Sequence, residues 1–346
     1  MRRIIRVFPT KTNATPDDDL VRIREVPSLF DDADEVHISV TFTWDKPWAE
    51  WAAKQWERVA PVKVGGPAYN EPGGEFVPGM YMRHGYVITS RGCPNRCWFC
   101  AVPKREGSHH RELPVRDGWI VQDDKLLACS QSHIDEVFSM LSRQPHKPQF
   151  TGGLEAAQLT PEIARRLRDL HPESMFFAYD TPNDLEPLVI AGRMLSQAGF
   201  SRESHSMRCY VLIGYKGDSF EKAQERMKQT WRAGFLPFAM LYRDFDGKTD
   251  KSWKGFQREW ANPIIVSCNF LGDMAGRFKI NGIWCDAPDG VPLATWLNEI
   301  VAVKGLDAYL MPTGYLRRLD LVERVRRTGR GIGVPISRVL SQSKKQ

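Results

Sequence analysis

The chain has 346 residues, of which 42% are hydrophobic and 26% charged, so it is long enough for about two domains with sizeable cores. This composition excludes disordered, collagen-like and coiled-coil proteins, and no run of 18 apolar residues predicts a membrane span. Residues 1–11 are positively charged but lack the apolar segment of a secretory signal. We therefore expect a cytoplasmic protein that does not contact membranes.

The net charge of +6 is concentrated near the C-terminus. Residues 315–346 contain nine Lys and Arg against two acidic residues, an excess of +7, so the remaining residues carry a net charge of −1. Clustered basic residues can bind the phosphates of a nucleic acid, or they can simply keep a solvated extension in water. We favour the solvated extension and treat nucleic-acid binding through residues 315–346 as the alternative.

Residues 1–80 predict a small α/β unit. Residues 36–42 form an apolar run typical of a buried strand, Pro47 opens a helical stretch, and residues 62–64 predict a second short strand. Strand, helix and strand in this order indicate a βαβ unit and therefore a small or cut-down α/β domain. The Gly- and Pro-rich segment 65–79 is the expected linker to the next domain.

Residues 81–262 predict a core of alternating strands and helices. Strands are expected at 85–89, from 119 to about 123, and at 148–151, 175–179, 208–213 and 236–242. Three helices are expected between them, one capped by Ser132, one opened by Thr160 and Pro161, and one running from near Asp218 to Gly234. Repeated βα units predict a parallel sheet or barrel with functional groups at the carboxyl ends of the strands. Residues 263–346 form a C-terminal extension with a possible strand at 264–266 and helices at 293–303 and 316–328.

Three cysteines follow the strand at 85–89 with the spacing C-x3-C-x2-C, at Cys93, Cys97 and Cys100. Soft thiolates this close together in a reducing compartment are typical ligands of an iron–sulfur cluster or another metal. A zinc site is the alternative, and its fourth ligand would be a nearby histidine. The candidates for that ligand are His84, His109 and His110.

The other cysteines show no second cluster-binding spacing. Cys129, Cys209, Cys268 and Cys285 are scattered along the chain, and each is expected to be a small buried hydrophobic residue.

The motif Cys93-x3-Cys97-x-Phe99-Cys100 resembles that of the radical S-adenosylmethionine (SAM) superfamily, in which the last cysteine follows an aromatic residue. The resemblance implies that the three thiolates hold three irons of a [4Fe-4S] cluster and that SAM chelates the fourth iron. It also implies reductive cleavage of SAM to a 5′-deoxyadenosyl radical that abstracts hydrogen from a substrate. The implied fold is α/β, with a partial parallel (βα)6 TIM-like barrel at residues 81–262 behind the N-terminal unit and before the basic extension.

The same resemblance implies further SAM contacts at the ends of the strands. Phe99 would lie by the adenine, and an acid after the second strand, Asp123 or Asp124, would receive the SAM ammonium group. The remaining expected contacts are Glu155 in a Gly-Gly-x-Glu segment after the third strand, Asp180 for the ribose, and Ile213 with Gly214 for the adenine. The sequence identifies no residue that acts on the substrate.

The N-terminal unit resembles the cobalamin-binding Rossmann-like domain that precedes the barrel in one radical SAM branch, which implies a reduced Rossmann-like unit at residues 1–80. It is shorter than that domain and lacks the D-x-H-x-x-G signature whose histidine ligates cobalt, because His37 has no glycine three residues later. We therefore expect no cobalamin and a structural role for residues 1–80.

The sequence leaves two classes of function open. The first is a radical SAM enzyme with a [4Fe-4S] cluster, SAM, an electron donor such as a flavodoxin or ferredoxin, and an unidentified substrate. The alternative is a non-enzymatic zinc-knuckle protein whose basic residues 315–346 bind nucleic acid.

Overall fold

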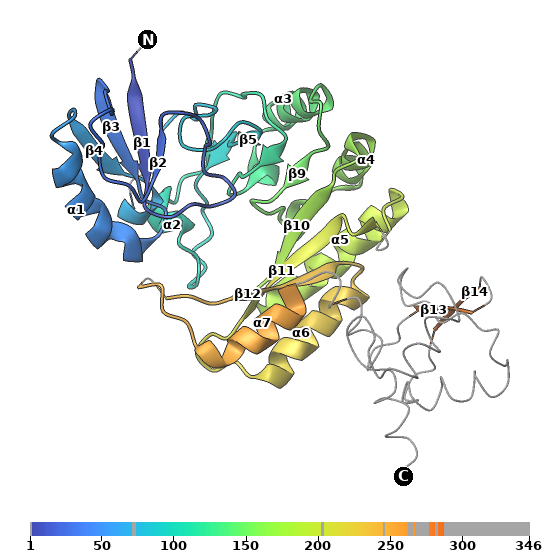
Figure 1. Cartoon of the computed structure of the whole chain (residues 1–346). Coiled ribbons are helices and arrows are strands. Elements are labelled where there is room, and N and C mark those ends of the chain that lie inside the picture. The colour runs from blue at the N-terminus through green and yellow to red at the C-terminus, as the bar shows by residue number, and fades with distance from the viewer. Residues whose placement is uncertain are drawn as a thin grey trace. The chain divides into compact units, whose positions relative to one another are not determined.

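The computed structural model describes residues 2–70, 74–201, 204–244, 246–261, 266, 277–280 and 283–286 (Figure 1). Contacts between Cα atoms divide the chain into two units. The first comprises Met1–Phe200 with Tyr242–Asp250, and the second comprises Ser201–Leu241 with Lys251–Gln346. Within the described residues, no helix is long and apolar enough to cross a membrane.

The first unit begins with a parallel sheet of four strands in the order β2-β1-β3-β4. Its strands are β1 (Ile4–Phe8), β2 (Val21–Ile23), β3 (Glu35–Ser39) and β4 (Val62–Gly65), and α1 (Lys46–Trp56) connects the last two. Trp56 of α1 is fully buried against the apolar side chains of β1 and β3, and this separate core lies within the predicted unit 1–80.

A second parallel set of strands in the same unit has the order β5-β8-β9-β10. Its members are β5 (Tyr86–Val87), β8 (Ile120–Val121), β9 (Gln149–Phe150) and β10 (Ser174–Tyr179). The helices α3 (Gln131–Ser142), α4 (Pro161–Leu170) and α5 (Leu185–Gln197) follow β8, β9 and β10 in the chain. A short antiparallel pair, β6 (Ser90–Arg91) with β7 (Arg111–Glu112), and the single turn α2 (Val102–Arg105) lie between β5 and β8.

The second unit contains the parallel pair β11 (Met207–Ile213) and β12 (Leu236–Leu241), joined by α6 (Phe220–Arg232). Helix α7 (Lys254–Ala261) packs against β12, and β13 (Arg277–Ile280) pairs antiparallel with β14 (Ile283–Asp286). A buried ion pair holds the turn after β11, where Arg226 contacts Asp218 at 2.8 Å and also donates to the Leu212 carbonyl at 2.8 Å.

All six strands predicted for residues 81–262 are present, although the first three are shorter than expected. The helix expected to be capped by Ser132 is instead capped by Ser130, whose hydroxyl accepts the His133 N–H at 3.4 Å. Thr160 does cap α4, accepting the Ile163 N–H at 3.2 Å. The predicted helices at 293–303 and 316–328 and residues 315–346 lie outside the described residues.

The chain is therefore an α/β protein built on parallel sheets, as predicted. Among the described residues no sheet closes on itself. What matters for function is that parallel strands end at a common edge, so the loops after β5, β8, β9 and β10 emerge side by side.

Candidate functional site

The three motif cysteines lie in one loop, residues 92–110, at the carboxyl end of β5. The loop is closed at its base by the β6–β7 pair, in which Arg91 faces Arg111, and by an ion pair of 2.8 Å between Arg91 and Glu106. Gly92 starts the loop with a φ of +82°, and a Cβ there would lie 2.2 Å from the His109 carbonyl oxygen. Glycine at this position is therefore what allows the two ends of the loop to approach.

The three thiols are free and partly exposed, and they influence one another electrostatically. Burial raises the pKa of the Cys97 thiol, and neighbouring Cys100 and Cys93 add to the increase. Burial also raises the pKa of Cys100, with Cys93, Asp124 and Asp180 contributing in the same direction. Without a bound cation the Cys97 and Cys100 thiols therefore stay protonated at neutral pH, and a metal would displace their protons on binding.

Asp123 follows β8 and is 2% exposed. Its carboxylate accepts hydrogen bonds from the Thr89 N–H at 2.6 Å, the Thr89 hydroxyl at 2.5 Å and the Ser90 hydroxyl at 2.8 Å. Gly152 permits the next loop to approach closely, since a Cβ there would lie 2.2 Å from the Asp123 carbonyl oxygen. Asp123 thus ties the end of β5, from which the cysteine loop emerges, to the end of β8.

Asp124 and Asp180 are two of the carboxylates that lie near the cysteine loop. Asp124 accepts the Gly92 N–H at 2.8 Å, and burial raises the pKa of its carboxyl. Asp180 follows β10, and its charge raises the pKa of both Cys97 and Cys100. Two acids predicted from separate strand ends are therefore placed beside the same loop.

Glu155 is placed differently, because it pairs with a buried lysine. The Lys125 ammonium group is 7% exposed and lies 2.6 Å from the Glu155 carboxylate. It also donates to the Asn95 side-chain oxygen at 3.3 Å, inside the cysteine loop. Sequence reasoning missed Lys125, which links the loop after β9 to the cysteine loop.

Two predicted residues lie in the second unit. Ile213 is the buried last residue of β11, and Gly214 follows it with a φ of +70°. A Cβ on Gly214 would lie 2.7 Å from Leu241 and 2.9 Å from Trp253, and its N–H donates to Asp218 at 2.9 Å. The positive φ and the close packing therefore require glycine at this position.

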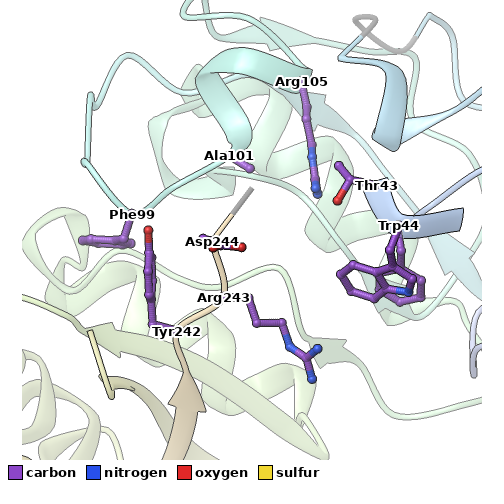
Figure 2. Close-up of a pocket in the computed structure, with 9 residues that line it drawn as sticks. Thr43, Trp44, Phe99, Ala101, Arg105, Tyr242, Arg243 and Asp244 are labelled. Atoms are coloured by element: carbon purple, nitrogen blue, oxygen red, sulfur yellow. The ribbon is translucent and has the colours of Figure 1, made fainter. Parts of the chain in front are cut away.

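Phe99 packs edge-on against Trp98, with ring centroids 5.3 Å apart, and lines a pocket beside the cysteine loop (Figure 2).

The donor set suits an iron–sulfur cluster, because three thiols on one loop are soft ligands and leave one cluster iron without a protein ligand. In the described part of the chain, no group of three His, Cys, Asp or Glu side chains converges closely enough to hold a metal ion. Of the histidines considered for zinc, His110 donates to the Lys125 carbonyl at 3.1 Å and lies 3.8 Å from the Cys129 sulfur. The fit to a cluster therefore rests on the chemistry of the donors.

Comparison with known proteins adds a likeness of fold. No protein-family model and no curated protein matches the chain. Among solved structures it is similar to the radical SAM methyltransferase TsrM from Kitasatospora setae, whose structure has cobalamin and a [4Fe-4S] cluster bound. The chains are 12% identical, and the match covers 85% of this chain and 82% of TsrM with a TM-score of 0.50. The chain therefore shares the fold of this methyltransferase. The resemblance implied by the cysteine motif thus extends to the arrangement of helices and strands.

Proposed function

We propose that the chain is a radical SAM enzyme in which Cys93, Cys97 and Cys100 hold a [4Fe-4S] cluster. The observation that carries this proposal is the three-cysteine loop at the carboxyl edge of a parallel sheet, in a chain that folds like a radical SAM methyltransferase. When bound, the cluster would supply the electron that cleaves SAM to methionine and a 5′-deoxyadenosyl radical able to abstract hydrogen from a substrate.

The residues around the loop have distinct roles in this proposal. Asp124 would receive the SAM ammonium group, because it is only partly buried and faces the cysteine loop. Asp180 would face the SAM ribose from the end of β10. Asp123 and Lys125 would hold the loop in place, since their polar groups are engaged with neighbouring strand ends.

Anaerobic reconstitution with iron and sulfide tests the proposal directly. We expect a brown protein with close to four iron and four sulfide ions per chain. With a reductant such as dithionite, or with a flavodoxin or ferredoxin system, it should convert SAM to 5′-deoxyadenosine and methionine, detected by mass spectrometry. A colourless protein with one bound zinc and no SAM cleavage would instead support the zinc-knuckle alternative.

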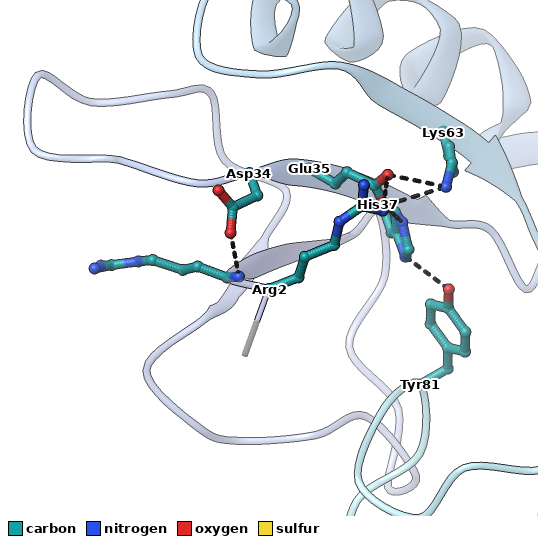
Figure 3. Close-up of polar contacts among 7 residues, drawn as sticks. Arg2, Asp34, Glu35, His37, Lys63 and Tyr81 are labelled. Carbon is teal, nitrogen blue, oxygen red and sulfur yellow. Dashed lines mark hydrogen bonds and ion pairs between the residues drawn. The ribbon is translucent and has the colours of Figure 1, made fainter.

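We propose that cobalamin is not a cofactor here, although TsrM binds it. The geometry at His37 supports this, because both of its ring nitrogens are engaged (Figure 3). Its Nδ1 lies 2.7 Å from the Tyr81 hydroxyl and its Nε2 lies 3.0 Å from the Glu35 carboxylate. Incubation with hydroxocobalamin followed by gel filtration should leave no cobalt on the protein, and stoichiometric cobalt would contradict this part of the proposal.

Replacing Asp124 should weaken SAM binding. A charge-assisted hydrogen bond to an ammonium group contributes about 1.5–3 kcal/mol, which corresponds to roughly 10–100-fold in affinity. We therefore expect Asp124→Ala to raise the Kd of the reconstituted protein for SAM by about one to two orders of magnitude, with iron content unchanged. Anaerobic isothermal titration calorimetry measures the Kd.

Two further variants separate the effect of the Asp124 charge from the effect of its hydrogen bond to the cysteine loop. Asp124→Asn keeps an acceptor for the Gly92 N–H but removes the charge, so it should weaken SAM binding as much as alanine does. Glu136→Gln removes a carboxylate from an exposed position of α3 and should bind SAM normally. Unchanged SAM affinity in both Asp124 variants would exclude Asp124 as the ammonium contact and make Asp180 the next residue to replace.

A further inference from the structure

A pocket of about 350 Å³ lies beside the cysteine loop (Figure 2). Its lining comes from three separate segments, which are residues 42–44 after β3, residues 99–105 of the cysteine loop and α2, and residues 242–244 after β12. Phe99 and Ala101, the neighbours of Cys100 in the sequence, form part of the wall. Its volume is within the range of small-molecule sites.

Aromatic rings form opposite sides of this pocket. Figure 2 shows Trp44 on one side and Phe99 with Tyr242 on the other. Trp44 stacks on Phe42 with centroids 4.7 Å apart and an interplanar angle of 8°. Tyr242 packs against Trp98 at 5.6 Å. Trp44 and Tyr242 are thus each packed against a second aromatic ring, Phe42 within the lining and Trp98 outside it, and such rings can face a flat ligand.

Two arginines also face the pocket, and neither has a carboxylate partner among the described residues. Arg105 reaches in from the end of α2, and the Arg243 guanidinium lies 5.7 Å from the centroid of Trp44. The nearby Asp244 is engaged by its own loop, since its Oδ1 accepts the N–H groups of Asp246 at 3.0 Å and Lys248 at 2.7 Å. The pocket therefore offers two planar cations to a ligand.

We propose that this pocket binds a planar aromatic compound that carries a carboxylate or a phosphate, and that such a compound is the substrate. Guanidinium groups match the geometry of both anions, and the facing aromatic rings match a flat ring system. The assignment of the ligand as substrate rests on the proposed radical SAM function, because the pocket shares a wall with the cysteine loop.

Four small probes test the ligand class on the reconstituted full chain. 1-Naphthoate and 1-naphthyl phosphate combine the ring with an anion, 1-naphthylmethylamine has the ring with a cation, and cyclohexanecarboxylate has the anion without the aromatic ring. By isothermal titration calorimetry, at least one of the two aromatic anions should bind at least 10-fold more tightly than either of the other two probes. Which aromatic anion binds better identifies the acidic group.

Arginine variants then test the pocket itself. Arg105→Gln and Arg243→Gln should each weaken binding of the preferred anion by about 10–100-fold, as expected for loss of one charge-assisted contact. Arg193→Gln, which removes the same charge from an exposed position of α5, is the matched control and should bind normally. Circular dichroism of each variant verifies folding. Equal binding of cationic and anionic probes, equal affinity in all three variants, or no binding of either aromatic anion at 10 mM would overturn the proposal.

The outcomes also separate this inference from the proposed function. If a protein that forms no cluster still binds an aromatic anion through Arg105 and Arg243, the result would support the proposed ligand of this pocket and refute the radical SAM function. Cluster formation and SAM cleavage without binding of either aromatic anion would refute the pocket assignment alone.

Discussion

Alanine at any one of the three motif cysteines is expected to leave the chain without a complete cluster. Each of Cys93, Cys97 and Cys100 would supply one thiolate to one iron, and no second cysteine spacing of this kind occurs in the sequence to replace it. We expect Cys93→Ala, Cys97→Ala and Cys100→Ala each to lose most bound iron after anaerobic reconstitution, and to produce no detectable 5′-deoxyadenosine from SAM. Iron analysis and mass spectrometry measure the two effects.

Cys129→Ala is the matched control for these variants. Cys129 is 8% exposed, and burial, the largest cause, raises the pKa of its thiol to about 12. Cys129 also lies outside the cysteine loop, directly after residues 126–128, so it is not expected to hold an iron. The control should keep its iron, so full iron content in Cys97→Ala, or an equal loss in Cys129→Ala, would contradict the assignment of ligands.

Replacing Asp123 by alanine should destabilise the fold strongly. The substitution leaves the Thr89 N–H and the hydroxyls of Thr89 and Ser90 without the carboxylate that now accepts their hydrogen bonds in a buried position. Each unsatisfied buried donor costs about 1–3 kcal/mol, although hydroxyls can partly reorient, so we expect a loss of about 3–5 kcal/mol in the free energy of unfolding. Urea denaturation followed by circular dichroism measures this loss. A loss below about 0.5 kcal/mol, as at a typical surface site, would refute it.

Asp123→Asn and the pH dependence of stability provide a sharper test. Burial raises the pKa of Asp123 in the folded chain above its usual 3.8, although the hydrogen bonds from Thr89 and Ser90 act in the opposite direction. Between 3.8 and the raised value the folded chain holds a proton that the unfolded chain has lost. This contribution to stability is therefore complete below pH 3.8 and is lost as pH rises through the folded pKa. Asp123→Asn should keep most of the stability, since the amide oxygen can accept the Thr89 N–H, and its stability should lack this pH-dependent component.

The sequence was sufficient to predict the strand ends that meet at the site. Apolar runs mark the strands, and polar residues follow each run, so parallel pairing brings Asp124, Asp180 and the cysteine loop to one edge. Strand β1 was missed because Arg6 interrupts its apolar pattern. Arg6 is nevertheless buried, with 7% of its surface exposed. Its burial is tolerated because its guanidinium donates to the Gly79 carbonyl at 2.9 Å and pairs with Asp18.

The partners of the individual acids could not be predicted in the same way. Lys125 and Glu155 are 30 positions apart in the sequence, and nothing in the local pattern around either indicates that they form an ion pair. The pocket lined by Arg105 and Arg243 could not be predicted for a similar reason, because the two arginines lie more than 130 positions apart and the walls come from three separate segments. Pairing between distant loops depends on tertiary structure, which residue periodicity does not encode.

The closed base of the cysteine loop bears on how the protein would mature. The contacts that close and anchor the loop are the β6–β7 pairing, the Arg91–Glu106 ion pair and the hydrogen bonds of Asp123, and none of them involves a motif thiol. The ends of the loop are therefore joined by the polypeptide itself, and iron binding has to order only the segment between them. In the proposed enzyme, an assembly factor would accordingly meet a cysteine loop whose two ends are already joined without iron.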